Sequence, residues 1–160
     1  MAVDTVVTQS VLIDAPPAIV FDVLVDPRSL EVRSRDTEVL AVETNGPLRA
    51  GSQYQRILRS HGLANRQLVT AIVVDAPHHF VTRTQLLGHT VEYDYEVTPI
   101  ADARTQLTLT KRAGGGWRIL KPLVAHLLTR PEHDADHVER IRELAETVAR
   151  SSSQIGRAHV

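Results

Sequence analysis

The sequence predicts a single α+β domain in which an antiparallel sheet covers a long C-terminal helix. Three observations predict this class. Short β-rich segments follow one another between turn signals from Thr37 to Arg112, one of them alternates strictly between apolar and polar residues, and the last part of the chain repeats its apolar residues at helical spacing. The length of 160 residues is typical of one domain.

The start of the chain predicts one strand followed by two short helices. Val3 to Ile13 is rich in Val, Thr, Leu and Ile, which favours a strand. Ala18 to Val25 predicts a helix, which Pro27 ends because a residue before proline disfavours helix. Arg28 to Arg33 predicts a second short helix. The apolar face of the first helix comprises Val20, Phe21 and Leu24.

The middle of the chain predicts about six further strands. Turn signals such as Asn45-Gly46-Pro47 and Leu87-Gly88 separate them, and strands joined by short turns form an antiparallel meander. The predicted strands are Val39–Glu43, Ser52–Arg59, Arg66–Val74, His79–Leu86, His89–Val97 and Arg104–Arg112.

Two neighbouring strands indicate which face of the sheet is buried. The inward positions are predicted to be Val91, Tyr93, Tyr95, Val97, Leu107 and Leu109. Glu92, Asp94 and Glu96 alternate with the inward positions from Val91 to Val97, which predicts a solvent-exposed outer face.

The C-terminal part predicts two helical segments after a flexible joint at Gly114 to Gly116. Trp117 to Leu128 is the first segment, and Pro131 is expected to break or kink the helix after it. Glu132 to Arg150 is the second, with an apolar stripe of Val138, Ile141, Leu144 and Val148.

Residues 151–160 are interpreted as a tail outside the domain, which spans 1–150, and we expect the tail to be disordered. The letters from Ile155 to Val160 match the in-frame translation of a common sequencing-library adapter. We therefore expect that the native C-terminus is missing or altered.

Composition and missing motifs exclude several classes of function. The net charge of −1 argues against a nucleic-acid surface, and the absence of cysteine excludes disulfides and thiolate sites. No apolar run is long enough to cross a membrane, and the first residues lack a secretion signal, so we expect a cytoplasmic protein. Nucleotide-binding glycine loops and the GxSxG hydrolase motif are absent.

Five short pieces in the right order carry a resemblance to a known superfamily. They are Ile13-Asp14-Ala15-Pro16-Pro17 with Val20-Phe21 and Asp26-Pro27, then Gly46-Pro47-Leu48-Arg49-Ala50-Gly51-Ser52, Asp75-Ala76-Pro77, Tyr95-Glu96-Val97-Thr98-Pro99 and Arg104-Thr105-Gln106-Leu107-Thr108. From about Val6 to Val148 the chain resembles the START-like or Bet v 1-like superfamily (SRPBCC), the polyketide cyclase/dehydrase and lipid-transport group.

This resemblance implies a helix-grip fold. A curved antiparallel sheet of about seven strands would wrap a long C-terminal helix, with two short helices after the first strand. An elongated apolar cavity between sheet and helix would suit lipids, polyketides and other flat or greasy molecules. The chain departs from the pattern by lacking a tryptophan shortly after Asp26-Pro27 and by having Pro131 in the last helix. Catalytic members share no short motif, so no catalytic residue is assigned.

The inward positions supply candidate pocket residues. A tyrosine hydroxyl at Tyr93 or Tyr95 would contact a ligand oxygen or simply complete core packing. Arg56 is in phase with Tyr54, so its guanidinium would either lie in the cavity, paired with a carboxylate or enolate, or lie in solvent in the opposite phase. The predicted pocket residues are Tyr54, Arg56, Arg83, Tyr93, Tyr95, Leu107, Leu109, Leu123, His126 and Leu127.

Histidines on the last two helices allow other chemistry. His126 would act as a general base in a dry pocket, or would lie at the edge of the apolar stripe. The spacing of His133 and His137 allows two metal ligands on one helix face, but no HExxH motif is present, and we expect neither metal nor cofactor.

Three function classes remain open from the sequence. The first is a module that binds a hydrophobic or aromatic small molecule, and the second is a cofactor-free cyclase, aromatase or dehydratase. The third is a protein-interaction role for the outer face of the sheet, which its charged positions disfavour. The sequence does not indicate the oligomeric state.

Overall fold

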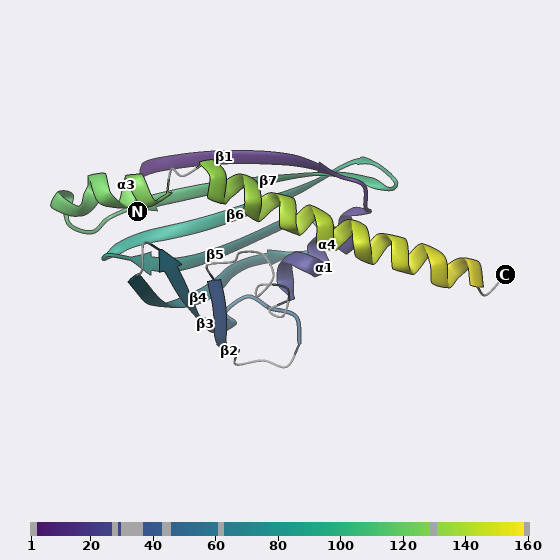
Figure 1. Cartoon of the computed structure of the whole chain (residues 1–160), viewed down its shortest axis with the longest axis horizontal. Helices are drawn as coiled ribbons and strands as arrows, with labels where there is room; N and C mark the ends of the chain where they lie inside the picture. Colours follow the sequence, from purple (N-terminus) through teal and green to yellow (C-terminus); the bar gives the residue numbers. More distant parts are fainter. Residues whose placement is uncertain are drawn as a thin grey trace.

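The computed structural model has the predicted α+β architecture. Seven antiparallel strands form one sheet in the order β1-β7-β6-β5-β4-β3-β2. The sheet is curved, and the long helix α4 lies across its concave side (Figure 1). The order follows from the predicted meander, since every neighbour pair except β1–β7 joins strands consecutive in the chain.

The structure describes the backbone of residues 3–26, 29, 37–42, 46–60, 63–128 and 131–158. Side chains are described within 6–26, 29, 46–57, 64–126 and 136–155. Of the short helix predicted from Arg28 to Arg33, all but Ser29 lies outside these ranges.

The bounds of the elements follow the sequence closely. The strands are β1 (Val3–Ile13), β2 (Thr37–Val42), β3 (Gln53–Ser60), β4 (Leu63–Asp75), β5 (His79–Leu86), β6 (His89–Ala101) and β7 (Arg104–Gly114). The helices are α1 (Pro17–Val25), the 3-10 helix η2 (Arg118–Leu120), α3 (Lys121–Leu128) and α4 (Pro131–Ala158).

Two prolines bear on these bounds, one against the sequence prediction and one in agreement with it. Strand β6 continues past Pro99, which is exposed and pairs with Thr105 in the β6–β7 hairpin. The predicted break at Pro131 is confirmed, because α3 ends at Leu128 and α4 begins at Pro131 itself, where the first helical position has no N–H partner to lose.

Helix α4 also departs from prediction in its end and in its buried stripe. It continues to Ala158, so residues 151–158 are helical where the sequence predicts a disordered tail. Val138 and Ile141 are buried as predicted, but Val148 is 44% exposed and the buried stripe continues through Ala145. An α-helix completes one turn in about 3.6 residues, so Ala145, four positions after Ile141, lies on the same inner side.

The core lies between the concave face of the sheet and the helices α1 and α4. Val20, Phe21 and Leu24 are buried, so the predicted face of α1 is confirmed. Phe21 and Phe80 meet edge to face with ring centroids 6.4 Å apart, and the stacked rings of Phe80 and Tyr95 have centroids 5.8 Å apart. These aromatic contacts join α1 to two strands of the sheet.

The convex face is polar, as the alternation of β6 predicts. Nε2 of His79 lies 2.7 Å from one carboxylate oxygen of Asp94, and Arg112 donates to the other at 2.8 Å. Because these charged groups lie on the convex face, the apolar core packs against the concave face.

We predict that the inner side of α4 carries much of the stability of the fold. Ile141→Ala removes a fully buried side chain and should lower the free energy of unfolding by about 2–5 kcal/mol in urea titrations. The matched change Val148→Ala on the same helix should alter it by no more than about 0.5 kcal/mol. Equal effects of the two changes would contradict this burial pattern.

Candidate functional site

Polar side chains gather on the concave face of the sheet, where a core of apolar residues would be expected. Arg56 on β3 is paired in register with Gln67 on β4, and Tyr93 and Tyr95 occupy the inward positions of β6. We call Tyr54, Arg56, Gln67, Tyr93, Tyr95, Lys111 and His137 the concave-face cluster. Strand alternation places the six sheet residues here, because each is separated by two positions from another inward residue.

Arg56 is fixed by two neighbours. Its Nε donates a hydrogen bond to Oε1 of Gln67 at 2.9 Å, and its guanidinium carbon lies 5.4 Å from the centroid of the Tyr93 ring. Gln67 is itself buried, and its amide nitrogen donates to the carbonyl oxygen of Gln85 at 3.3 Å. The amide thus orients the guanidinium, and the ring contributes a cation–π contact.

Arg56 keeps its positive charge in this environment. Burial lowers the pKa of the guanidinium, but the neighbouring phenol groups of Tyr93 and Tyr54 raise this pKa by more, so it ends above its usual value. The inner face of the sheet therefore carries a permanent cation.

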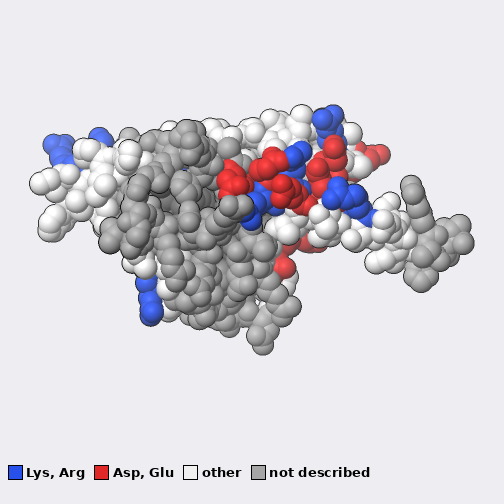
Figure 2. All heavy atoms as spheres, viewed as in Figure 1, with Lys and Arg blue, Asp and Glu red and all other residues white. Residues whose placement is uncertain are grey.

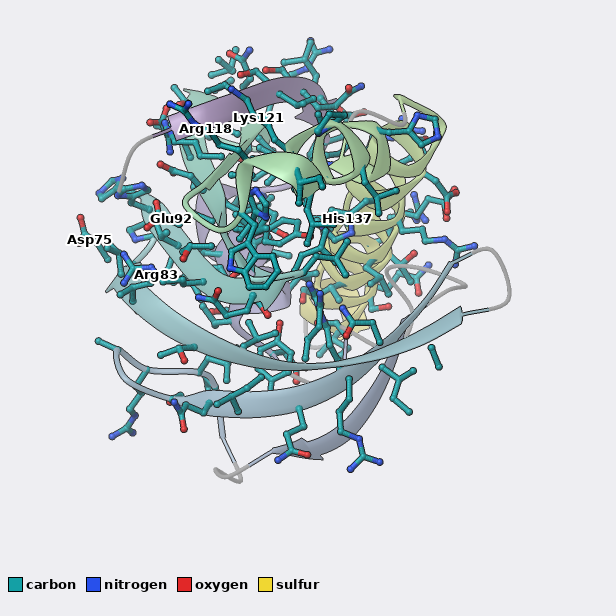
Figure 3. The ribbon with its side chains drawn as sticks, turned by 90° about the vertical axis from the view of Figure 1, so that its left-hand side faces the viewer. Asp75, Arg83, Glu92, Arg118, Lys121 and His137 are labelled. Carbon is teal, nitrogen blue, oxygen red and sulfur yellow. The ribbon has the colours of Figure 1, made fainter. Side chains whose placement is uncertain are left out.

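Tyr95 connects the sheet to the long helix. Its hydroxyl lies 2.8 Å from Nε2 of His137 on α4, and the two ring centroids are 6.1 Å apart. Figure 3 shows His137 between the helix and the inner side of the sheet. An imidazole and a phenol in contact form a pair that can pass a proton between them.

Lys111 is a member of the cluster that sequence reasoning missed. It is buried, and it lies directly opposite Tyr93 in the register between β6 and β7. Strand alternation could have predicted its inward position, because Lys111 lies two residues after Leu109 and therefore on the same face of the strand. A second cation therefore lies near the ring that contacts Arg56.

Three of the other residues predicted for the pocket lie on the concave face. Tyr54, Leu107 and Leu109 are buried on the concave face, and the two leucines belong to the apolar core. The side chain of Leu127 lies outside the described residues.

Three predicted pocket residues do not belong to the cluster. Arg83 is exposed on the convex face and donates to Glu92 at 2.7 Å, because its neighbours Thr82 and Thr84 take the inward positions (Figure 3). Leu123 and His126 are exposed, because α3 turns Val124 and not these residues toward the sheet. These three predictions are wrong.

One group among the described residues has the geometry of a metal site. His79, Asp94 and Glu96 each offer a ligand atom, and these atoms lie within 4.8 Å of one another. Both oxygens of Asp94 are already bound, one by His79 and one by Arg112. A cation would have to displace the guanidinium, so we assign no metal here. His133, the other predicted ligand, has no described side chain.

Among the described helices none combines the length and the apolar character needed to span a lipid bilayer.

A curved antiparallel sheet around a C-terminal helix, with its functional groups on the concave face, defines a helix-grip α+β domain. The model of the family described as polyketide cyclase/dehydrase and lipid transport matches residues 4–146. The chain therefore belongs to this family. No curated protein matches the chain in sequence.

Solved structures of similar shape are distant in sequence. A protein from Arthrobacter aurescens shares 17% identity at a TM-score of 0.68, with 91% of each chain covered. Norcoclaurine synthase from Thalictrum flavum, solved with dopamine and hydroxybenzaldehyde, shares 13% at a TM-score of 0.67, over 88% of this chain and 85% of the synthase. A protein from Thermus thermophilus shares 18% at a TM-score of 0.66, over 93% of this chain and 99% of that one. At these identities the similarity shows the fold alone.

We predict a measurable coupling between Tyr95 and His137. In a double-mutant cycle with Tyr95→Phe and His137→Leu, urea unfolding should give a coupling of about 0.5–1.5 kcal/mol, the usual net value of one hydrogen bond. The same cycle with the exposed His126→Leu in place of His137→Leu should be additive. Additivity in both cycles would show that the Tyr95–His137 contact contributes nothing.

Proposed function

We propose that the protein binds a hydrophobic or aromatic small molecule, of lipid or polyketide type, in an internal cavity between the concave face of the sheet and α4. The concave-face cluster carries this proposal. Ligand sites are mostly apolar with a few polar groups that fix orientation. The concave face combines the apolar core residues Leu107 and Leu109 with Arg56 and Tyr93 of the cluster.

Two inward-facing cations support an acidic or oxygen-rich end on the ligand. Arg56 and Lys111 both face inward, and none of the inward positions described on the strands β3 to β7 holds an Asp or Glu. Guanidinium groups bind carboxylates through paired hydrogen bonds, and they bind enolates through their charge. A ligand with such a group would place that group beside Arg56 and its apolar part along Leu107 and Leu109.

The structural relatives are compatible with a small aromatic guest. The norcoclaurine synthase structure holds dopamine and hydroxybenzaldehyde, both of which are flat and aromatic. We extend to this chain only the ligand class, because the shared fold hosts many functions.

We predict that Arg56 discriminates between two probes that differ by one sulfonate. The anionic probe is 8-anilinonaphthalene-1-sulfonate, and the neutral one is N-phenyl-1-naphthylamine. Arg56→Gln should weaken the anionic probe by about tenfold or more, the effect of losing one charged hydrogen bond, and should leave the neutral probe unchanged. Fluorescence titrations of both probes measure this.

The matched control is Arg83→Gln, which removes the same charge from the convex face. It should leave the affinity of both probes unchanged. If neither probe binds the wild-type protein, the proposed cavity is refuted. If both bind and Arg56→Gln affects them equally, the cavity stands and the anchoring role of Arg56 is refuted.

A second candidate function, cofactor-free cyclisation or dehydration, is favoured by the Tyr95–His137 pair. In such a reaction a base removes a proton from a carbon beside a carbonyl, and the enolate carbon attacks a second carbonyl. The resulting alkoxide regains that proton, and the hydroxyl then leaves with a second carbon-bound proton as water. His137 would move the proton and Arg56 would hold the enolate oxygen.

We expect a direct assay to separate this candidate from a carrier. A synthetic poly-β-carbonyl thioester is incubated with the protein, and mass spectrometry follows the loss of one water. For an enzyme, His137→Gln should slow the loss by about a hundredfold or more, while the exposed His126→Gln should not. A wild-type rate equal to that of buffer would reject the enzyme and leave the carrier.

A further inference from the structure

The segment that follows β7 exposes large apolar side chains on one short stretch. Trp117 is 75% exposed, Ile119 81% and Leu123 47%. Isolated apolar residues on a surface are ordinary, but several close together in one segment mark an interaction site. None of them belongs to the concave-face cluster.

This exposure does not arise from a loose chain. Gly115 and Gly116 have φ of +74° and +71°, and a Cβ on Gly116 would lie 2.6 Å from Nδ1 of the buried His89. Beyond them, Val124 of α3 is buried in a small apolar cluster with Leu86, Val91 and Ala113. The close fit at Gly116 and the buried valine hold the segment against the sheet, so its apolar side faces outward.

The charge around this surface is positive. Arg118 and Lys121 are exposed, and Figure 3 shows both at the outer side of the segment. The sequence contains no Asp or Glu between Asp102 and Glu132. On the face shown in Figure 2, the described charged atoms at the end of the molecule where α3 lies are basic. Most of the other visible charge lies toward α4, where both signs are mixed.

Tryptophan, aliphatic side chains and adjacent cations are the combination that lies at a membrane interface. The indole and the aliphatic groups enter the boundary between headgroups and acyl chains, and the cations contact anionic headgroups. A protein partner would also meet apolar residues, but the excess of positive charge favours an anionic lipid surface.

We propose that the segment from Trp117 to Leu123 docks the protein on an anionic lipid surface, with Trp117 and Ile119 inserted at the interface. In this docking the segment lies at the membrane surface and does not cross the bilayer. It does not depend on the proposed ligand, although the partly buried Tyr93 packs against the same small cluster as Val124. The docked segment is thus connected, through this cluster, to the ring that contacts Arg56.

Trp117 provides the readout, because it is the only tryptophan in the chain. The full-length protein is mixed with vesicles of equal parts phosphatidylglycerol and phosphatidylcholine, or of phosphatidylcholine alone. With the anionic vesicles the Trp117 emission should shift to shorter wavelength and the protein should sediment with the lipid. Neither should occur with the neutral vesicles, and added salt should weaken the binding.

Charge variants test the basic residues. Arg118→Gln with Lys121→Gln should weaken sedimentation with the anionic vesicles by about tenfold or more. The matched control, Arg104→Gln with Arg150→Gln, removes the same net charge at exposed positions elsewhere and should not weaken it. Ile119→Ser should weaken binding while retaining the single fluorophore.

Three results would overturn the proposal. One is an unchanged Trp117 spectrum with both kinds of vesicle. Another is equal binding to both kinds, since the cations would then contribute nothing. The third is an emission shift that grows with protein concentration in the absence of lipid, with a dimer in sedimentation velocity, because the segment would then join two copies of the chain.

Discussion

The partly buried guanidinium of Arg56 is the constraint on which the arrangement of the concave face depends. Taking a charge out of water is costly unless other groups replace the lost hydration. The Gln67 amide accepts from Arg56 and the Tyr93 ring lies beside its guanidinium carbon, so two strands supply part of that replacement. A ligand with an acidic or enolic oxygen would supply more, which links the stability of this face to what it binds.

The second feature of the fold is the series of ring contacts that crosses its layers. Phe21 of α1, Phe80 of β5, Tyr95 of β6 and His137 of α4 are in contact one after another. The series begins in the dry core and ends at a hydrogen bond between two groups able to exchange a proton. The packing that holds α4 against the sheet therefore also positions polar chemistry at the edge of the core.

Much of the fold could be predicted from the sequence because its signals are local. The alternation in β6 gave the inward side of Tyr93 and Tyr95, and the turn signals gave β5 its bounds. The errors have physical causes. Arg83 lies in a strand of mixed Thr and Arg, where alternation gives no apolar phase. Val124 is the one buried residue among the described side chains of α3, so periodicity could not orient Leu123 or His126. The contact of His137 with Tyr95 could not be predicted, because the sequence does not show which strand α4 packs against.

The most direct test of Arg56 as the inward anchor is a spectrum of arginine Nε–H groups recorded by NMR. The signals of Arg56 and Arg83 are assigned by their loss in Arg56→Gln and Arg83→Gln. Saturation with 8-anilinonaphthalene-1-sulfonate should move the Arg56 signal and leave that of Arg83 in place. A bound probe that leaves the Arg56 signal unmoved would contradict the account.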